Sequence, residues 1–144
     1  PEIDRFEGKT IYFKDSSYEE FDSVIACTGF ELAHPFFDKN FLNYTEGPVP
    51  LYLKMFHAEY DNLFFIGMFQ PLGCIWPGAE QQSILATLAL KGLWERPSNM
   101  KALCEREVTN PHMKQINTSR HRITVDFHKF LKDLQKQIKK VKKI

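Results

Sequence analysis

Residues 62–94 read NLFFIGMFQPLGCIWPGAEQQSILATLALKGLW, and the clearest structural signals of the chain are concentrated here. Residues 63–66 form a short unbroken apolar run before Gly67, which is typical of a buried strand in a parallel sheet. Two clusters of turn-forming residues follow, at positions 70–73 and 77–78. The sequence therefore predicts a strand that leads through a tight Pro/Gly loop into the next element.

The pattern changes to helical spacing from Ala79 onward. Its apolar residues cover most of the helix circumference, which is typical of a buried helix. They are Ile84, Leu85, Ala86, Leu88, Ala89, Leu90 and Leu93. Open α/β sheets bind ligands at the carboxyl ends of their strands, where the following helix points its unpaired N–H groups at the ligand. We therefore predict a ligand-facing unit made of the strand, the loop and the helix start.

Length and composition are those of a soluble globular domain. The chain has 144 residues with 19 basic and 18 acidic side chains, so its charge gives no case for a nucleic-acid partner. Its three cysteines are far apart and lack C-x-x-C spacing, which favours free thiols in a reducing, cytoplasmic setting. No signal peptide or transmembrane anchor is visible, and the five histidines lack the spacing of metal ligands.

The N-terminal part of the chain predicts short strands. Residues 9–14 (KTIYFK) are rich in β-formers and open a hairpin whose return begins at Tyr18. Residues 23–27 predict a further apolar strand. Residues 30–50 carry three prolines and predict a junction, after which residues 51–57 (LYLKMFH) alternate roughly and predict another strand.

The C-terminal part of the chain predicts helices. Ser98 is a candidate N-cap for one helix, and Thr124 is a candidate N-cap for the last helix, with Asp126 in its first turn. The apolar residues of the last helix lie on one face. They are Phe127, Phe130, Leu131, Leu134, Ile138 and Val141. Its other positions are rich in lysine, and such a face suits either a membrane surface or solvent.

Two motifs stand out from the rest of the chain. The first consists of Phe65-Ile66-Gly67, Gln70-Pro71-Leu72-Gly73, Ile75, Pro77, Ala79-Glu80 and Gln82. It resembles the C-terminal signature of the flavin-containing monooxygenases, in which a QPLG loop and a P-x-AE-x-Q helix start close the FAD site. The second motif, residues 22–30 (DSVIACTGF), resembles the D-x-V-I-x-A-T-G-Y segment that links the NADP and FAD domains of that family. Cys27 stands where the family usually has alanine.

The resemblance implies an α/β fold, the C-terminal part of a two-dinucleotide-binding (Rossmann-like FAD/NAD(P)) fold with a helical C-terminal tail. It implies that residues 1–29 end the NADP-binding domain, that residues 30–50 link the domains, and that residues 51–144 form the C-terminal part of the FAD-binding domain with terminal helices. The chain has seven glycines and no G-x-G-x-x-G, the turn that lets a backbone approach a pyrophosphate. We therefore expect a missing N-terminal half as a partner. We also expect an isolated chain that is inactive, binds flavin weakly or not at all, and tends to form homo-oligomers.

The resemblance also implies a reaction that depends on FAD and NADPH. In the family, NADPH reduces FAD, O₂ adds at flavin C4a, and the resulting hydroperoxide transfers oxygen to a soft nitrogen or sulfur of a small substrate. Two alternatives stay open, a related Baeyer–Villiger or N-hydroxylating flavoprotein and a non-catalytic binding module. Disulfide reductases usually end the equivalent strand in Gly-Asp, so Gly67-Met68 counts against them.

Candidate site residues follow from their place in these motifs, and none is predicted to be catalytic. The Gln70 amide is suited to bonding the flavin edge or to stabilising its own loop. N–H groups from about Ala79 to Gln81 are expected to face the flavin, and Glu80 is expected to cap its own helix. Trp76 either borders a substrate channel or packs in the interior. The predicted cofactor-binding set is Gln70, Pro71, Leu72, Gly73, Pro77, Ala79, Gln81, Thr28 and Gly29.

Overall fold

The computed structural model describes residues 1–29, 32–38, 41–42, 49–110 and 121–141. The chain divides into two compact units, Pro1–Phe30 and Glu31–Ile144, and each is described by itself. The predicted junction over residues 30–50 falls largely outside the described residues. Among the described helices, none combines the length and the apolar composition needed to cross a membrane.

The first unit is a three-stranded antiparallel sheet in the order β1-β2-β3. Its strands are β1 (Ile3–Glu7), β2 (Thr10–Phe13) and β3 (Tyr18–Glu20). The predicted hairpin is therefore confirmed as β2 and β3, with Ser16 at φ 70° in the turn between them. The strand predicted at residues 23–27 is wrong, because Val24 and Ile25 are exposed and no described strand lies beside them to pair with or to cover them.

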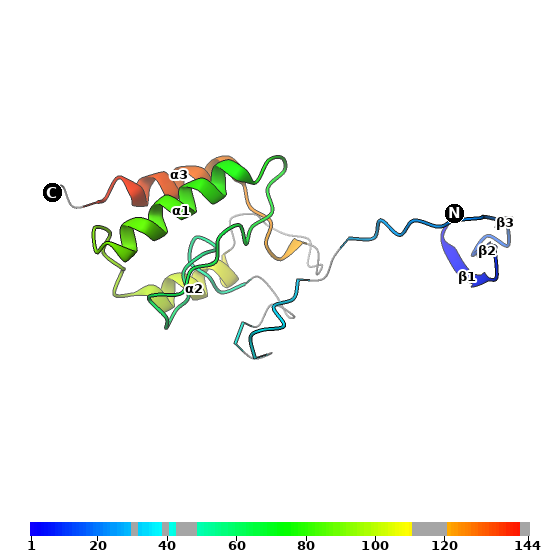
Figure 1. The fold of residues 1–144 in the computed structure, drawn as a ribbon, viewed down its shortest axis with the longest axis horizontal. Helices are drawn as coiled ribbons and strands as arrows, with labels where there is room; N and C mark the ends of the chain where they lie inside the picture. Colours follow the sequence, from blue (N-terminus) through cyan, green and yellow to red (C-terminus); the bar gives the residue numbers. More distant parts are fainter. Residues whose placement is uncertain (30–31, 39–40, 43–48, 111–120, 142–144) are drawn as a thin grey trace. The chain divides into compact units, whose positions relative to one another are not determined.

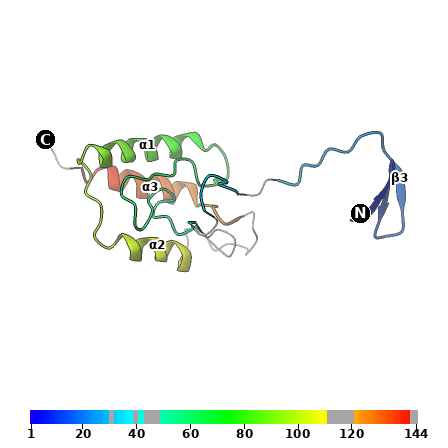
Figure 2. The ribbon, with the colours of Figure 1, turned by 60° about the horizontal axis from the view of Figure 1, so that its bottom comes forward.

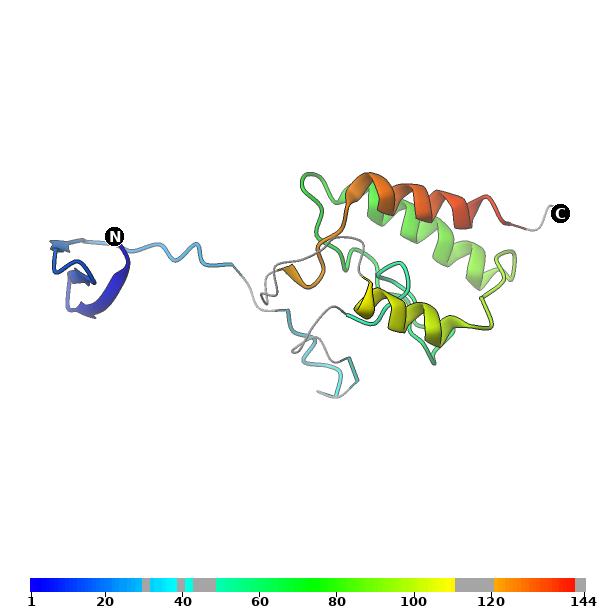
Figure 3. The same cartoon turned by 180° about the vertical axis from the view of Figure 1, so that it is seen from behind.

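The described residues of the second unit form three helices, α1 (Trp76–Leu90), α2 (Met100–Thr109) and α3 (Phe127–Ile138). Helices α1 and α3 run side by side, as Figure 1 shows. Most of the loop segment of residues 49–75 lies between this pair and α2, and its last part curves around the start of α1, which can be followed in Figures 2 and 3. The core therefore forms where irregular segments are held between helices. Its buried members are Tyr52, Leu53, Met55, Phe56, Phe69, Leu85, Ala86, Trp94, Met100, Cys104, Val125, Phe130 and Leu134.

A short parallel bridge precedes both α1 and α3. The Gln70 N–H donates to the Ile123 carbonyl at 2.8 Å, and the Val125 N–H donates to the Gln70 carbonyl at 3.1 Å. Since both helices begin a few residues after this bridge, it fixes where their N-termini lie relative to each other. The last helix is amphipathic as predicted, but its N-cap is Asp126, whose carboxylate accepts from Lys129 N–H, and not Thr124.

Two predicted strands of the second unit take another form. Residues 51–57 form a tight turn closed by a bridge between Tyr52 and Phe56, with Leu53 and Lys54 at φ 52° and 54°. Residues 63–66 make only an isolated antiparallel bridge, Phe64 with Phe56. The physical reason is that a strand needs a neighbouring ladder, and the described residues offer this segment only the tight turn.

Helix α1 lies so close to the preceding loop that one position has no room for a side chain. A Cβ atom built on Gly78 would lie 2.3 Å from Cζ of Phe69. The Phe69 ring is itself buried and packs on the Phe130 ring of α3, with ring centroids 4.7 Å apart. The glycine therefore allows α1 to seat against both Phe69 and α3.

We expect the substitution Gly78→Ala to lower the free energy of unfolding by about 1–3 kcal/mol, because the added methyl overpacks a filled interior. In an exposed helix interior the same change raises stability by about 1 kcal/mol, so the sign of the effect is informative. Urea denaturation of both proteins measures it. Adding Phe69→Leu to Gly78→Ala should cost less than the sum of the two single changes. A higher unfolding midpoint for Gly78→Ala alone would contradict this packing.

Candidate functional site

The loop of residues 70–73 reaches the surface directly before α1. Leu72 and Gly73 are exposed, Pro71 is half-buried, and Gly73 adopts φ 122°, a conformation that favours glycine. The backbone of Gln70 is tied down by the parallel bridge, whereas its side chain is exposed and has no hydrogen-bond partner among the described residues. An amide donor and acceptor is thus held on a fixed backbone and faces outward.

The N-terminus of α1 lies next to this loop and its positive end is not compensated. Ile75 is the N-cap residue and gives no side-chain hydrogen bond, Pro77 occupies the first turn, and no acidic residue lies there. The predicted cap by Glu80 is therefore wrong, as is the predicted helix start at Ala79, since Pro77 suits an earlier start. The Ala79 N–H donates to the Ile75 carbonyl, so it does not face outward. A helix end of this kind favours an anionic or carbonyl-bearing group.

The structure brings most of the predicted site residues together around this helix start. Pro77 is exposed, while Ala79 and Gln81 are half-buried in the first turns of α1. Trp76 has 75% of its surface exposed, so the interior packing that the sequence also allowed for it is wrong. Thr28 and Gly29 are exposed and belong to the first unit, which is described by itself. The loop and the helix start are therefore the part of the predicted site that the structure assembles.

The structure also assigns a role to Gln82, which is not among the predicted site residues. Gln82 is completely buried in α1, and both ends of its amide are used. Its Oε1 accepts from the Gly67 N–H at 2.8 Å, and its Nε2 donates to the Leu53 carbonyl at 3.0 Å. A glutamine within a nearly continuous apolar helix is the signal that indicates such a role, because a buried amide needs partners.

A buried ion pair lies on the other side of the turn that carries Leu53. Lys54 Nζ is 3.4 Å from Glu107 Oε2 on α2, and the two side chains are 1% and 5% exposed. Burial lowers the pKa of the Lys54 amino group below its ordinary value, although the neighbouring Glu107 carboxylate opposes that shift. The tight turn is thus held between α1 and α2.

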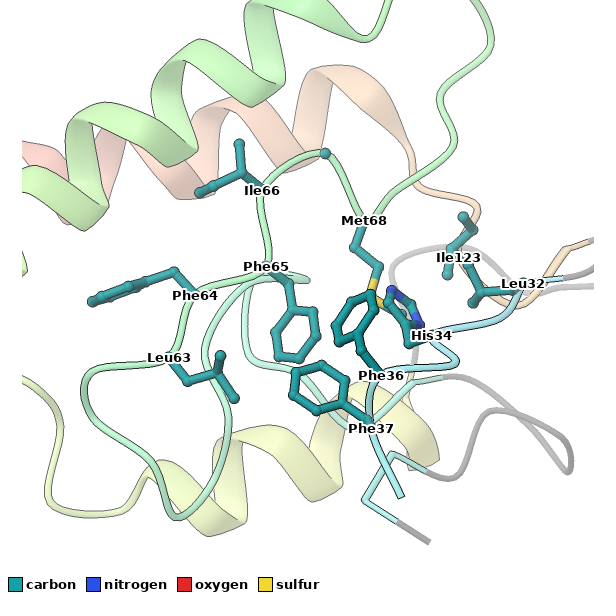
Figure 4. A pocket seen from close by; sticks show the side chains of 11 residues that line it. Leu32, His34, Phe36, Phe37, Leu63, Phe64, Phe65, Ile66, Met68 and Ile123 are labelled. Carbon is teal, nitrogen blue, oxygen red and sulfur yellow. The ribbon is translucent and has the colours of Figure 1, made fainter. Parts of the chain in front are cut away.

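An apolar pocket of about 430 Å³ lies beside residues 63–68. Figure 4 shows the rings of Phe36, Phe37 and Phe65 next to one another, with His34 beside Met68. The His34 ring meets the Phe65 ring edge-on at 6.1 Å. The pocket is lined by Leu32, His34, Phe36, Phe37, Leu63, Phe64, Phe65, Ile66, Gly67, Met68 and Ile123. Within the described ranges, no cluster of three or more His, Cys, Asp or Glu side chains is placed to hold a metal ion.

Comparison with known proteins shows one family over the whole chain. The sequence model described as flavin-binding monooxygenase-like matches residues 1–144. Flavin-containing monooxygenase 5 of Rattus norvegicus is 34% identical over 130 residues, which are 87% of this chain and 24% of the relative. The same-named protein of Oryctolagus cuniculus is 31% identical over 92% of this chain and 26% of its own length. Dimethylaniline monooxygenase (N-oxide-forming) 2 of Rattus norvegicus is 34% identical over 66% of this chain. The chain spans about a quarter of the length of the first two relatives.

The buried ion pair gives a first prediction for this region. We expect Glu107→Gln to lower the free energy of unfolding by about 3–5 kcal/mol, because it leaves the Lys54 ammonium buried without a counter-charge. Replacing both partners, as Lys54→Met with Glu107→Leu, should restore most of that loss. The exposed pair Lys9–Asp22 serves as the control, and Asp22→Asn should cause no measurable loss. Equal effects of Glu107→Gln and Asp22→Asn in urea denaturation would contradict the account.

The lowered pKa of Lys54 predicts a pH dependence of stability. Below the folded-state pKa both states are protonated, and the cost of burying the ammonium is present in full. As pH rises, the folded state releases this proton before the unfolded state does, so stability increases toward the ordinary pKa of lysine. Denaturation of wild type and Lys54→Met across alkaline pH measures the difference. The difference in free energy of unfolding between the two proteins should shift in favour of the wild type as pH rises. A difference that does not change with pH would argue against a lowered pKa of Lys54.

Proposed function

The chain belongs to the flavin-binding monooxygenase-like family, and from that premise we propose that it is the C-terminal part of an FAD- and NADPH-dependent monooxygenase. The match over residues 1–144 carries this proposal. One relative is named for forming N-oxides, which favours soft nitrogen, and by the same chemistry sulfur, as the atom of a small substrate that receives oxygen. The active protein is then longer than this chain, since the matched relatives are about four times as long.

The residues around the start of α1 fit a flavin. The pyrimidine end of the isoalloxazine ring carries two carbonyls and an N–H, and it gathers negative charge when the ring is reduced. The exposed Gln70 amide can both donate to and accept from such an edge. The uncompensated positive end of α1 favours the same charge. We therefore assign the flavin edge to Gln70, Pro71, Leu72, Gly73 and Pro77. Ala79, whose N–H is already bonded to the Ile75 carbonyl, and Gln81 are proposed to lie beside that edge in the first turns of α1.

The residues of this chain have the task of orienting the flavin and of excluding water from it. Bound FAD would accept hydride from NADPH and supply the chemistry that activates O₂. Leu72 and Trp76 are large apolar side chains that are 87% and 75% exposed beside the loop. In the proposed protein they would keep water away from the ring, with Trp76 at the border of the substrate channel. Thr28 and Gly29 are proposed to line the linker beside both cofactors.

The proposed fold is that of a two-dinucleotide-binding protein. Residues 1–29 end its NADP-binding domain, residues 30–50 link the domains, and residues 51–144 complete its FAD-binding domain. The polypeptide that this chain lacks would supply the G-x-G-x-x-G turns for both nucleotides and a parallel neighbour for residues 63–66. The apolar pocket of Figure 4 lies beside the same segment, which forms only the isolated bridge to Phe56 among the described residues.

We expect the isolated chain to bind flavin weakly and without preference for the nucleotide. Because the chain has no phosphate-binding glycine motif, riboflavin, FMN and FAD should bind with affinities within about threefold of one another. Loss of one hydrogen bond in Gln70→Ala should weaken riboflavin binding by about 2- to 13-fold. Fluorescence anisotropy of the flavin measures all three ligands.

The control for this titration is Gln135→Ala, which removes an exposed amide on α3, away from the loop. It should leave riboflavin binding unchanged. Much tighter binding of FAD than of riboflavin would point to a phosphate site elsewhere in the chain. Equal binding by wild type and Gln70→Ala would show that the loop does not contact the ring.

A further inference from the structure

We infer that Gln82 is a positioning residue that sets the flavin-facing loop against the start of α1, an inference that rests on the proposed function for the role of the loop. Gln82 is completely buried, so it acts through other groups and does not contact the ligand. Its two hydrogen bonds reach segments 15 and 29 residues away along the chain. The amide therefore joins three separate parts of the structure at one point.

The first of these parts is the segment directly before the loop of residues 70–73. Gly67, whose N–H bonds Gln82 Oε1, adopts φ 78° and lies three residues before Gln70. The two residues between them, Met68 and Phe69, are buried, and the Phe69 ring contacts Gly78 in the first turn of α1. A fixed Gly67 therefore fixes the path that leads to the Gln70 amide.

The second part is the tight turn of residues 52–56. Its residues Leu53 and Lys54 both have positive φ, a conformation that costs energy for residues with a side chain. Gln82 Nε2 holds the Leu53 carbonyl from one side, and Glu107 of α2 holds Lys54 from the other. The strained turn is thus anchored at both of its unusual residues, and α2 is connected through it to the loop.

A neutral amide or a protonated carboxyl at position 82 can satisfy both partners. The Gly67 N–H needs an acceptor, and the Leu53 carbonyl needs a donor. An ionised carboxylate supplies only acceptors, and a thioether side chain supplies no donor. The variant Gln82→Glu should therefore hold the loop when protonated and release it when ionised, whereas Gln82→Met should release it at any pH.

The test measures amide hydrogen exchange at Gly67 in the full chain, wild type against the two variants, with riboflavin affinity measured in parallel. In Gln82→Met we expect exchange at Gly67 to rise by about tenfold or more, as for the loss of a buried hydrogen bond. Phe130, whose N–H donates to the Asp126 carbonyl in α3, reports global unfolding and should change much less. Gln135→Met, the same change at an exposed position of α3, is the matched control and should leave Gly67 exchange and riboflavin affinity unchanged.

The variant Gln82→Glu separates a positioning role from a purely structural one, because it links Gly67 protection and riboflavin affinity to pH. In Gln82→Glu, protection at Gly67 and riboflavin affinity should both approach wild-type values at acidic pH and fall together as the carboxyl ionises. Unchanged exchange at Gly67 in Gln82→Met, or equal acceleration at Gly67 and Phe130, would overturn the inference. A change at Gly67 with no riboflavin binding by any protein would leave Gln82 as the residue that positions the loop, and would instead remove the flavin assignment.

Discussion

The arrangement of the second unit depends on one buried amide. Gln82 accepts from Gly67 and donates to Leu53, and so it joins α1 to two segments that have no regular structure of their own. Because an unpaired amide in this interior would be costly, the three segments are stable only in one relative position. The exposed loop at residues 70–73 takes its place from this constraint.

Aromatic packing of Phe69 further fixes the segment before the loop. Phe69 fits against Gly78 at the start of α1 and against Phe130 of α3, while a parallel bridge ties Gln70 to the segment before α3. The loop is thus fixed immediately before its exposed residues. A rigid segment before the loop, with polar and apolar side chains exposed on the loop itself, suits a binding site. The ligand then does not have to order the loop.

The sequence predicted the parts of this molecule that depend on local patterns. The hairpin, the amphipathic α3 and the loop before α1 were all predicted, because turn residues and apolar periodicity act over short distances. The sequence also predicted strands at 51–57 and 63–66, where the structure has a tight turn and an isolated bridge. This prediction failed because strand formation depends on neighbours that a local pattern does not reveal. The same limit applies to Gln82, whose partners are distant in sequence. It also applies to Lys54, because the alternating pattern of residues 51–57 does not indicate its ion pair with Glu107.

We propose that the loop of residues 70–73 and the first turns of α1 contact the ring of a flavin. Chemical-shift mapping of the backbone amides during titration with riboflavin tests it most directly. We expect the largest chemical-shift changes between Gln70 and Gln81, and only small changes at amides around the apolar pocket, such as His34 and Phe37. The largest changes at the pocket, with none in the loop, would contradict it.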